Sequence, residues 1–251
     1  MKSHDSATSA ALSTRGTTSP TEAVLRPPVA AESTAAATAA GPPVAARRVA
    51  LGRYVGYWFD RTPRRALYCA SYYKFAARLI GRGSRVLDVG CSEGLGTWLL
   101  ANECGSARGI DPDEAAVAVA RDNWRDPRIE FVCDDFLAAA PAEYDAVVNF
   151  DVIEHIFPEH AEDFLARIAA NLVENGMAVV GTPSLQGQAY ASDVSKAGHV
   201  NVYSGQRLEE AMRRHFRHVF MFAANDEVVH TGFLPMAHYL IAVGCIKRTV
   251  C

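Results

Sequence analysis

Long apolar stretches are missing from this sequence of 251 residues. A helix that spans a membrane needs about 20 consecutive apolar residues, so no such span is expected. The first segment holds Lys2 and a run rich in serine, threonine and alanine, without the apolar core of a secretory signal. The six cysteines include no C-x-x-C pair, which favours reduced, mostly buried thiols and a cytoplasmic protein.

A strong charge of one sign is also missing. The chain has 25 Lys and Arg against 28 Asp and Glu, a formal net charge of -3. No long basic stripe and no familiar RNA-binding pattern is visible, which argues against nucleic acid as the main partner. The oligomeric state is not encoded in any pattern we can read. With 49% hydrophobic residues and no internal repeat, the composition predicts one α/β core.

Large apolar residues are scarce in residues 1–46, where alanine, serine, threonine, proline and glycine dominate. Such a segment cannot bury enough apolar surface to offset the entropy lost on ordering. We predict a disordered tail over 1–46. A partner-binding role is the alternative.

The composition changes abruptly at residues 47–84, a segment rich in arginine and aromatic residues. Between Arg47 and Arg85, ten Lys or Arg stand against a single acid, Asp60, and Thr62-Pro63 marks the start of a helix. One interpretation is a helical cap that offers cations and aromatic faces to an acceptor molecule. The other is an amphipathic helix that packs on the sheet and leaves a basic face in solvent.

Residues 86–97, VLDVGCSEGLGT, combine a buried strand, a glycine-rich turn and the start of a helix. Gly90, Gly94 and Gly96 allow a tight turn and a close approach of the backbone to a ligand. The free N–H groups of the following helix point at whatever occupies the turn. The spacing differs from the G-x-G-x-x-G fingerprint of dinucleotide-binding dehydrogenases.

This segment resembles motif I of the class I S-adenosylmethionine-dependent methyltransferases, an acid followed by G-x-G-x-G. Asp88 and the three glycines match, and Ser92 stands where the middle glycine is usual. The resemblance spans about 85–245. It implies a Rossmann-like, doubly wound α/β fold with seven strands in the order 3-2-1-4-5-7-6, the last strand antiparallel, as a methyltransferase domain over 85–251.

The expected strands cover 86–89, 107–110, 129–133, 146–150, 177–181, 218–223 and 238–245, and the expected helices include 112–122, 158–174 and 207–215. Asp111 ends the second strand, where a carboxylate can accept hydrogen bonds from two ribose hydroxyls. Its alternative role is the N-cap of the helix 112–122, with Pro112 in the first turn. Segments 184–204 and 224–235 show no clear period and are long enough to be functional loops.

The resemblance implies S-adenosyl-L-methionine as cofactor. It assigns Asp134 to the adenine amino group. The complete expected cofactor-binding set is Asp88, Gly90, Cys91, Gly94, Asp111, Pro112, Asp134, Asp135 and Asp151.

Asp151, Glu154 and His155 follow the fourth strand and would share one face of a helical turn at the carboxyl edge of the sheet. With His199 from the later loop, this group is similar to the carboxylate and histidine set of the small-RNA 3'-terminal 2'-O-methyltransferases, which hold a divalent ion. The Glu-His pair also resembles that of ubiquinone-pathway O-methyltransferases. All four residues are candidate ligands for Mg, Mn or Zn. The alternative makes His155 or His199 a metal-free base or an orienting donor, beside Glu154 as a third catalytic candidate.

These observations predict a small-molecule O-methyltransferase that acts on a secondary metabolite, a lipid head group or a sugar. The basic cap favours an anionic or polar acceptor. Three alternatives remain open at this point: a metal-dependent RNA 2'-O-methyltransferase, an N- or C-methyltransferase, and a non-catalytic scaffold protein that binds the cofactor.

Overall fold

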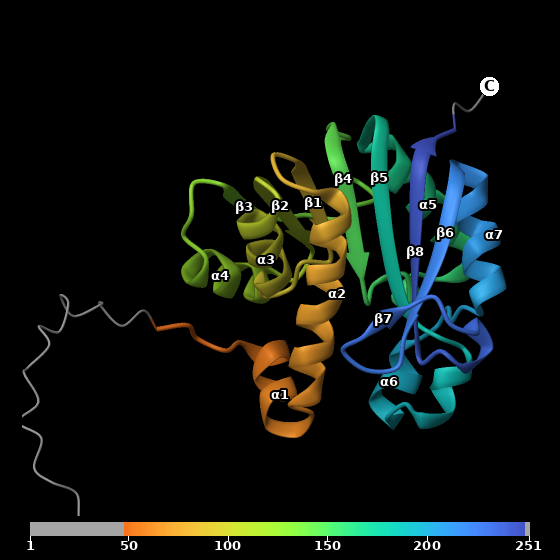
Figure 1. Ribbon diagram of the computed structural model, residues 1–251. Helices are drawn as coiled ribbons and strands as arrows, with labels where there is room; N and C mark the ends of the chain where they lie inside the picture. Colours follow the sequence, from red (N-terminus) through yellow and green to blue (C-terminus); the bar gives the residue numbers. More distant parts are fainter. Residues whose placement is uncertain (1–47, 249–251) are drawn as a thin grey trace, which may run out of the picture. The chain divides into compact units, whose positions relative to one another are not determined.

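The computed structural model describes residues 48–248, so the tail predicted over 1–46 lies outside the described residues. One α/β unit is formed (Figure 1). Its strands are β1 (Arg85–Val89), β2 (Ser106–Asp111), β3 (Ile129–Cys133), β4 (Tyr144–Phe150), β5 (Leu172–Pro183), β6 (Phe216–Ala224), β7 (Val229–His230) and β8 (Tyr239–Lys247). Its α-helices are α1 (Arg53–Arg61), α2 (Arg64–Ile80), α3 (Leu95–Glu103), α4 (Glu114–Asn123), α5 (Ala161–Ala170), α6 (Asp193–Gly198) and α7 (Gly205–His215). Short 3-10 turns cover Ile153–His155, Pro158–His160, Gln186–Tyr190 and Leu234–Met236.

The strands form one sheet in the order β3-β2-β1-β4-β5-β8-β6-β7. β1 to β5 are parallel, and β8 runs antiparallel between β5 and β6. The expected α/β fold and strand order are therefore confirmed. The expected count of seven is short by one, because the two-residue strand β7 adds to the edge beside β6. A pair of residues is too short to produce a recognisable alternation in sequence.

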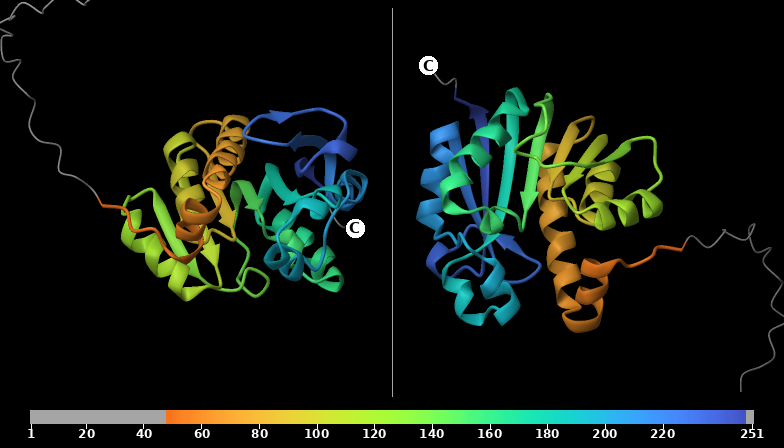
Figure 2. Two further views of the ribbon diagram at one scale, coloured as in Figure 1. Left: turned by 90° about the horizontal axis from the view of Figure 1, so that it is seen from below. Right: turned by 180° about the vertical axis from the view of Figure 1, so that it is seen from behind.

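Helices cover both faces of the sheet (Figure 2). In β1, Val86 packs in a cluster with α2 and α3, whereas Leu87 and Val89 pack with α5 and α7 on the opposite face. Neighbouring side chains of a strand point to opposite faces, and both faces here are buried. This explains why the central strands read as continuous apolar runs.

The helix expected over 158–174 ends earlier than its sequence pattern suggests. α5 ends at Ala170. Asn171 donates two hydrogen bonds to the carbonyl of Arg167, one from its backbone N–H (3.2 Å) and one from its side-chain amide (2.9 Å). The carbonyl of Asn171 accepts the N–H of Tyr144 (3.0 Å), and the buried Leu172 begins β5. The pairing of Leu172 with Tyr144, 28 positions upstream, thus ends the helix, and Gly176 lies inside β5.

The carboxyl ends of the parallel strands meet at one edge of the sheet. α1, the first turns of α2 and α6 gather at this edge (Figure 1). Ligands of open α/β sheets bind at such an edge. Within 48–248, none of the helices has both the length and the apolar character required to cross a bilayer.

Candidate functional site

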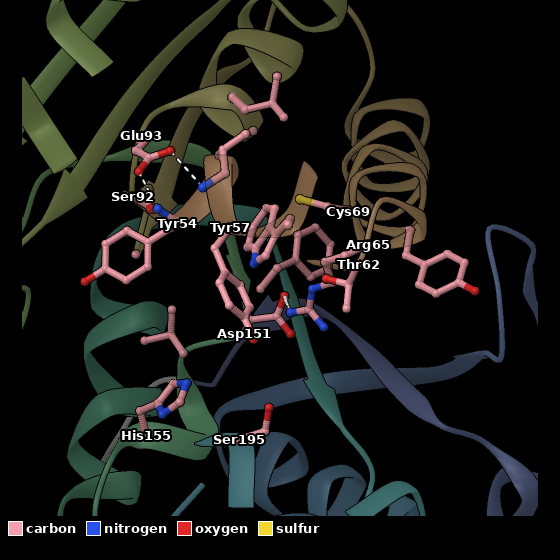
Figure 3. Close-up of a pocket in the computed structure, with 18 of the residues that line it drawn as sticks. Tyr54, Tyr57, Thr62, Arg65, Cys69, Ser92, Glu93, Asp151, His155 and Ser195 are labelled. Carbon is pink, nitrogen blue, oxygen red and sulfur yellow. Dashed lines mark hydrogen bonds and ion pairs between the residues drawn. The ribbon is translucent and has the colours of Figure 1, made fainter. Parts of the chain in front are cut away.

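A cavity of about 1040 Å³ opens at the carboxyl edge of the sheet (Figure 3). Small-molecule sites range from about 300 to 1,000 Å³, so this cavity has room for a nucleoside cofactor and a second molecule. One wall is the glycine turn after β1 together with Asp111 and Pro112, and another is the end of β4. α1 and α2 form a third wall, and the segment that holds α6 forms the fourth. Lining residues from the last two walls include Tyr57, Trp58, Arg61, Arg64, Arg65, Tyr68, Tyr190, Ser195 and His199.

The turn after β1 requires glycine for two reasons. Gly90 and Gly94 have φ of +77° and +78°, a region that residues with a side chain seldom adopt. A Cβ on Gly90 would overlap Val152, and one on Gly94 would lie 2.6 Å from the Phe131 ring. The predicted turn is therefore built as expected, with its backbone exposed to the cavity at Gly90, Cys91 and Ser92.

Asp111 lies directly against this turn. Its Oδ2 accepts the N–H of Ser92 (2.8 Å) and its Oδ1 accepts the N–H of Asp113 (2.9 Å). Each carboxylate oxygen keeps a further lone pair for a ligand, because a carboxylate offers about four acceptor positions. The alternative role of Asp111 as a helix cap is wrong: α4 begins at Glu114, and the N-cap is Asp113, whose side chain accepts the N–H groups of Ala115 and Ala116.

Three other predicted cofactor acids, Asp88, Asp134 and Asp135, do not line the cavity. Asp88 is fully buried under the turn, where its carboxylate accepts hydrogen bonds from the hydroxyls of Tyr73 (3.0 Å) and Thr97 (2.6 Å). Burial raises the pKa of Asp88 to about 7. Asp134 and Asp135 follow β3 and are exposed, and neither side chain belongs to the cavity lining. The N–H of Asp134 donates to the carbonyl of Asp111 (3.2 Å), which places the end of β3 beside the end of β2.

Asp151 is turned away from the other polar residues of its segment. It has φ of +58°, and its Oδ2 pairs with Nη2 of Arg65 at 2.7 Å, as the dashed line in Figure 3 marks. The helical turn expected to align Asp151 with Glu154 and His155 is wrong, because the following residues form a short 3-10 turn that begins only at Ile153. Arg65, which sequence reasoning missed, therefore decides where this carboxylate points.

Glu154, His155 and His199 do come together, with one possible ligand atom of each within 4.8 Å of the others. Glu154 is buried; its Oε2 accepts the hydroxyl of Thr182 (3.0 Å), and no described residue bonds to its Oε1. Burial, and then the charge of Asp151, raises the pKa of Glu154 to about 8.

The two histidines face each other at a ring-centroid distance of 5.1 Å. Nδ1 of His155 lies 2.8 Å from the carbonyl of Gly198, and Nδ1 of His199 lies 3.2 Å from Oε1 of Gln188. The Gly198 carbonyl can only accept, so Nδ1 of His155 donates to it and Nε2 of His155 is left for a ligand, whereas the contact of His199 with the Gln188 side chain fits either tautomer. Burial, and then His155, lowers the pKa of His199. The arrangement can take up a proton or hold a cation.

The basic and aromatic segment divides between the cavity and the sheet. In the second half of α2, Tyr72 stacks on Tyr239 at 4.3 Å and Phe75 meets Phe222 edge-on, which is packing on the sheet. Tyr57 and Trp58 of α1 instead line the cavity. The change from cavity wall to core occurs along α2, which periodicity alone does not show.

Comparison with known proteins agrees with the sequence motif. Residues 86–176 match the family model of a methyltransferase domain. A probable S-adenosylmethionine-dependent methyltransferase of Mycolicibacterium smegmatis is 36% identical over 131 residues, which cover 51% of this chain and 46% of that protein. The mitochondrial ubiquinone biosynthesis O-methyltransferase of Arabidopsis thaliana is 31% identical over 124 residues, which cover 47% of this chain and 38% of that protein. The matches therefore span less than half the length of these relatives.

The fold also resembles solved structures. The 1,6-didemethyltoxoflavin-N1-methyltransferase of Burkholderia thailandensis, solved with bound 1,6-didemethyltoxoflavin and S-adenosylhomocysteine, matches with a TM-score of 0.59 at 19% identity. The match covers 78% of this chain and 86% of that one. At this identity the likeness concerns the fold alone.

Proposed function

Because the chain carries a class I S-adenosylmethionine-dependent methyltransferase domain, we propose that it transfers a methyl group from this cofactor to a hydroxyl of a small anionic acceptor. The observation that carries the proposal is the junction of the glycine turn, Asp111 and the cavity wall of α1 and α2. The first two fit a nucleoside, and the last offers room and contacts for a second molecule. A scaffold that only binds the cofactor would not need the polar group at Glu154 and His155.

S-adenosylmethionine, when bound, supplies a methyl group that its sulfonium already activates. The protein's main tasks are therefore to orient the acceptor and to accept its proton. In this proposal Asp111 receives the ribose hydroxyls, and the backbone from Gly90 to Ser92 lies against the cofactor. His155 lines the cavity with a free Nε2 and is the proposed base, with His199 beside it.

Basic side chains at the cavity rim indicate an anionic acceptor. Arg64 lies in the cavity wall at the first turn of α2, and no ion pair is found for it among residues 48–248. Arg61 lines the same wall, and among the described residues its one ion pair is with its exposed neighbour Asp60, at 2.9 Å. Tyr57 and Trp58 line the same wall, and their rings with these cations suit a flat organic body with a negative group.

Methylation assays on paired phenols test this acceptor class. We expect labelled methyl transfer from S-adenosylmethionine to 3,4-dihydroxybenzoate to be faster than to catechol, which lacks the carboxylate. Arg64→Met should raise KM for the carboxylated compound about 3- to 5-fold, the value of an exposed charge pair, and leave the reaction with catechol unchanged.

Arg82→Met is the matched control, because Arg82 is exposed and does not line the cavity. Equal rates for the two phenols, or equal effects of the two variants, would contradict an anionic acceptor. Methyl transfer to amines or carbon acids alone would contradict O-methylation and favour an N- or C-methyltransferase. Salt-sensitive binding of RNA at physiological ionic strength would favour the RNA alternative.

A second candidate is metal-assisted O-methylation, and the unpartnered Oε1 of Glu154 favours it. A carboxylate oxygen and one ring nitrogen from each of the two histidines are ligand types that suit Zn or Mn. A bound divalent ion would lower the pKa of an acceptor hydroxyl. Asp151 lies outside this ligand group and is paired with Arg65.

Calorimetric titration of Mg, Mn and Zn into protein saturated with S-adenosylhomocysteine tests this candidate. Micromolar binding is expected, and His155→Ala combined with His199→Ala should abolish it. His230→Ala is a control for adventitious histidine binding, since His230 lies in β7. Binding that survives the double variant, or no binding to the wild type, leaves the metal-free base as the mechanism.

A further inference from the structure

The first turn of α1 is capped by a residue that is distant in sequence. The N-cap of α1 is Gly52, which has no side chain to accept a backbone hydrogen bond. The carboxylate of Glu93 takes this role: Oε1 accepts the N–H of Tyr54 at 2.7 Å and Oε2 accepts the N–H of Val55 at 2.9 Å. These are the second and third N–H groups of the helix, the ones that an N-cap side chain ordinarily satisfies. A carboxylate at this end also interacts favourably with the helix dipole.

Glu93 is buried, and a hydrogen bond from Trp124 fixes its backbone. It is only 3% exposed, and its carbonyl accepts Nε1–H of Trp124 at 2.9 Å. The Trp124 ring stacks on Trp98 of α3 at 4.8 Å. Gly94, which follows Glu93 in the chain, has a positive φ, and a Cβ added to it would lie 2.8 Å from the same Trp124 ring. The backbone of Glu93 is thus part of the turn that lines the cavity, while its side chain holds α1.

The Glu93 carboxylate lies so close to Gly52 that a side chain at this N-cap position would not fit. A Cβ added to Gly52 would overlap the Glu93 carboxylate, although φ of -81° suits any residue. A second tie lies nearby, because the hydroxyl of Tyr54 donates to Oδ2 of Asp113 at 2.8 Å. These contacts connect α1 to the turn after β1 and to the segment after β2. Figure 3 shows Glu93 beside Tyr54, with Tyr57 of the same helix projecting into the cavity.

We propose that Glu93 is a positioning residue. It couples the glycine turn after β1, here called the cofactor turn, to the cavity wall formed by α1 and α2, here called the acceptor wall. α1 contributes Tyr57, Trp58 and Arg61 to the cavity, and Glu93 holds the start of this helix from within the glycine turn. Filling the turn with cofactor therefore stabilises the cap of α1 and orders the acceptor wall. The coupling rests on the proposed cofactor function, whereas the cap itself does not.

Hydrogen exchange of the Tyr54 and Val55 amides measures the cap directly. Hydrogen bonds to a charged group contribute about 1.5–3 kcal/mol each, so Glu93→Ala should speed exchange of these two amides at least about 10-fold. Exchange of the amides in β1 and β4 should stay unchanged. In the wild type, saturating S-adenosylhomocysteine should slow exchange at Tyr54 and Val55 further, and Glu93→Ala should remove this ligand effect. Glu93→Gln, which retains one acceptor oxygen, should restore part of it.

Variants on the other side of the contact separate positioning from a general loss of stability. Gly52→Ala should act like Glu93→Ala, because its Cβ displaces the carboxylate. In the Glu93→Ala background, Gly52→Ala should add almost nothing, since no carboxylate remains to be displaced. Gly56→Ala is the matched control in the same helix; its Cβ would meet Leu51 at an ordinary 3.7 Å, and exchange should not rise.

The outcomes are distinguishable. If S-adenosylhomocysteine does not bind the wild type, the proposed cofactor function fails, while the ligand-free exchange still tests the cap. If it binds and protects both amides equally in wild type and Glu93→Ala, the coupling is overturned. Additive effects of Gly52→Ala and Glu93→Ala would also overturn it, as would faster exchange throughout the sheet, which would show a structural role only.

Discussion

Gly94→Ala is expected to lower the free energy of unfolding by about 2–6 kcal/mol, the largest loss of stability among the changes considered. A residue other than glycine held at positive φ costs about 1–3 kcal/mol, and overpacking a buried site adds about 1–3 kcal/mol. Gly94 has φ of +78°, and the new Cβ would lie 2.6 Å from the Phe131 ring and 2.8 Å from Trp124. Phe131 and Trp124 belong to one buried cluster, so a shift of either ring disturbs the packing of its neighbours. Urea unfolding followed by tryptophan fluorescence measures the change.

Gly83→Ala is the control for the backbone contribution. Gly83 has a similar φ of +83°, but a Cβ there would meet nothing within 4 Å. We expect it to cost about 1–3 kcal/mol, for the backbone alone. Equal losses for the two variants would show that contact with the rings does not matter and that the turn can move.

Asp111→Ala is expected to weaken the binding of S-adenosylhomocysteine at least about 30-fold. Each hydrogen bond to a charged group is worth about 1.5–3 kcal/mol, and loss of two such bonds to ribose hydroxyls exceeds 2 kcal/mol. The change also leaves the N–H groups of Ser92 and Asp113 without their acceptor, so the turn loses its preformed shape. Isothermal titration calorimetry gives the affinity, and circular dichroism checks the fold.

Asp134→Ala serves as the comparison for this effect. Its side chain is exposed and outside the cavity lining, so we expect a loss of affinity several-fold smaller than for Asp111→Ala. Asp111→Asn should fall between the two, because an amide oxygen still accepts hydrogen bonds but carries no charge. A loss at Asp134 as large as that at Asp111 would mean that the adenine contact implied by the motif dominates binding.

Features of short range were readable before the structure was known. The apolar runs at 86–89 and 146–150 predicted buried parallel strands, because strands covered on both faces lose the alternation of a surface strand. Gly90 and Gly94 predicted a turn that only glycine can form, and both have positive φ. The strand order followed from the resemblance of the glycine turn to a known motif, not from periodicity.

Features that depend on distant contacts were misjudged. The helix expected to reach residue 174 ends at Ala170, because Asn171 and Leu172 join a neighbouring strand. Asp151 was expected beside Glu154 but pairs with Arg65, a residue 86 positions earlier in the chain. Sequence spacing places residues on a face of one element and carries no information about which other element will meet them.

The sequence by itself determined the α/β class and the glycine turn, since each depends on local backbone preference or on a pattern within about ten residues. Only the tertiary structure decided which polar groups share the cavity. The group of Glu154, His155 and His199 was expected from the resemblance, but the structure alone set Arg65 against Asp151 and placed the carboxylate of Glu93 at the start of α1. These pairings arise from the packing of segments far apart in the chain, where shape and burial choose the partner.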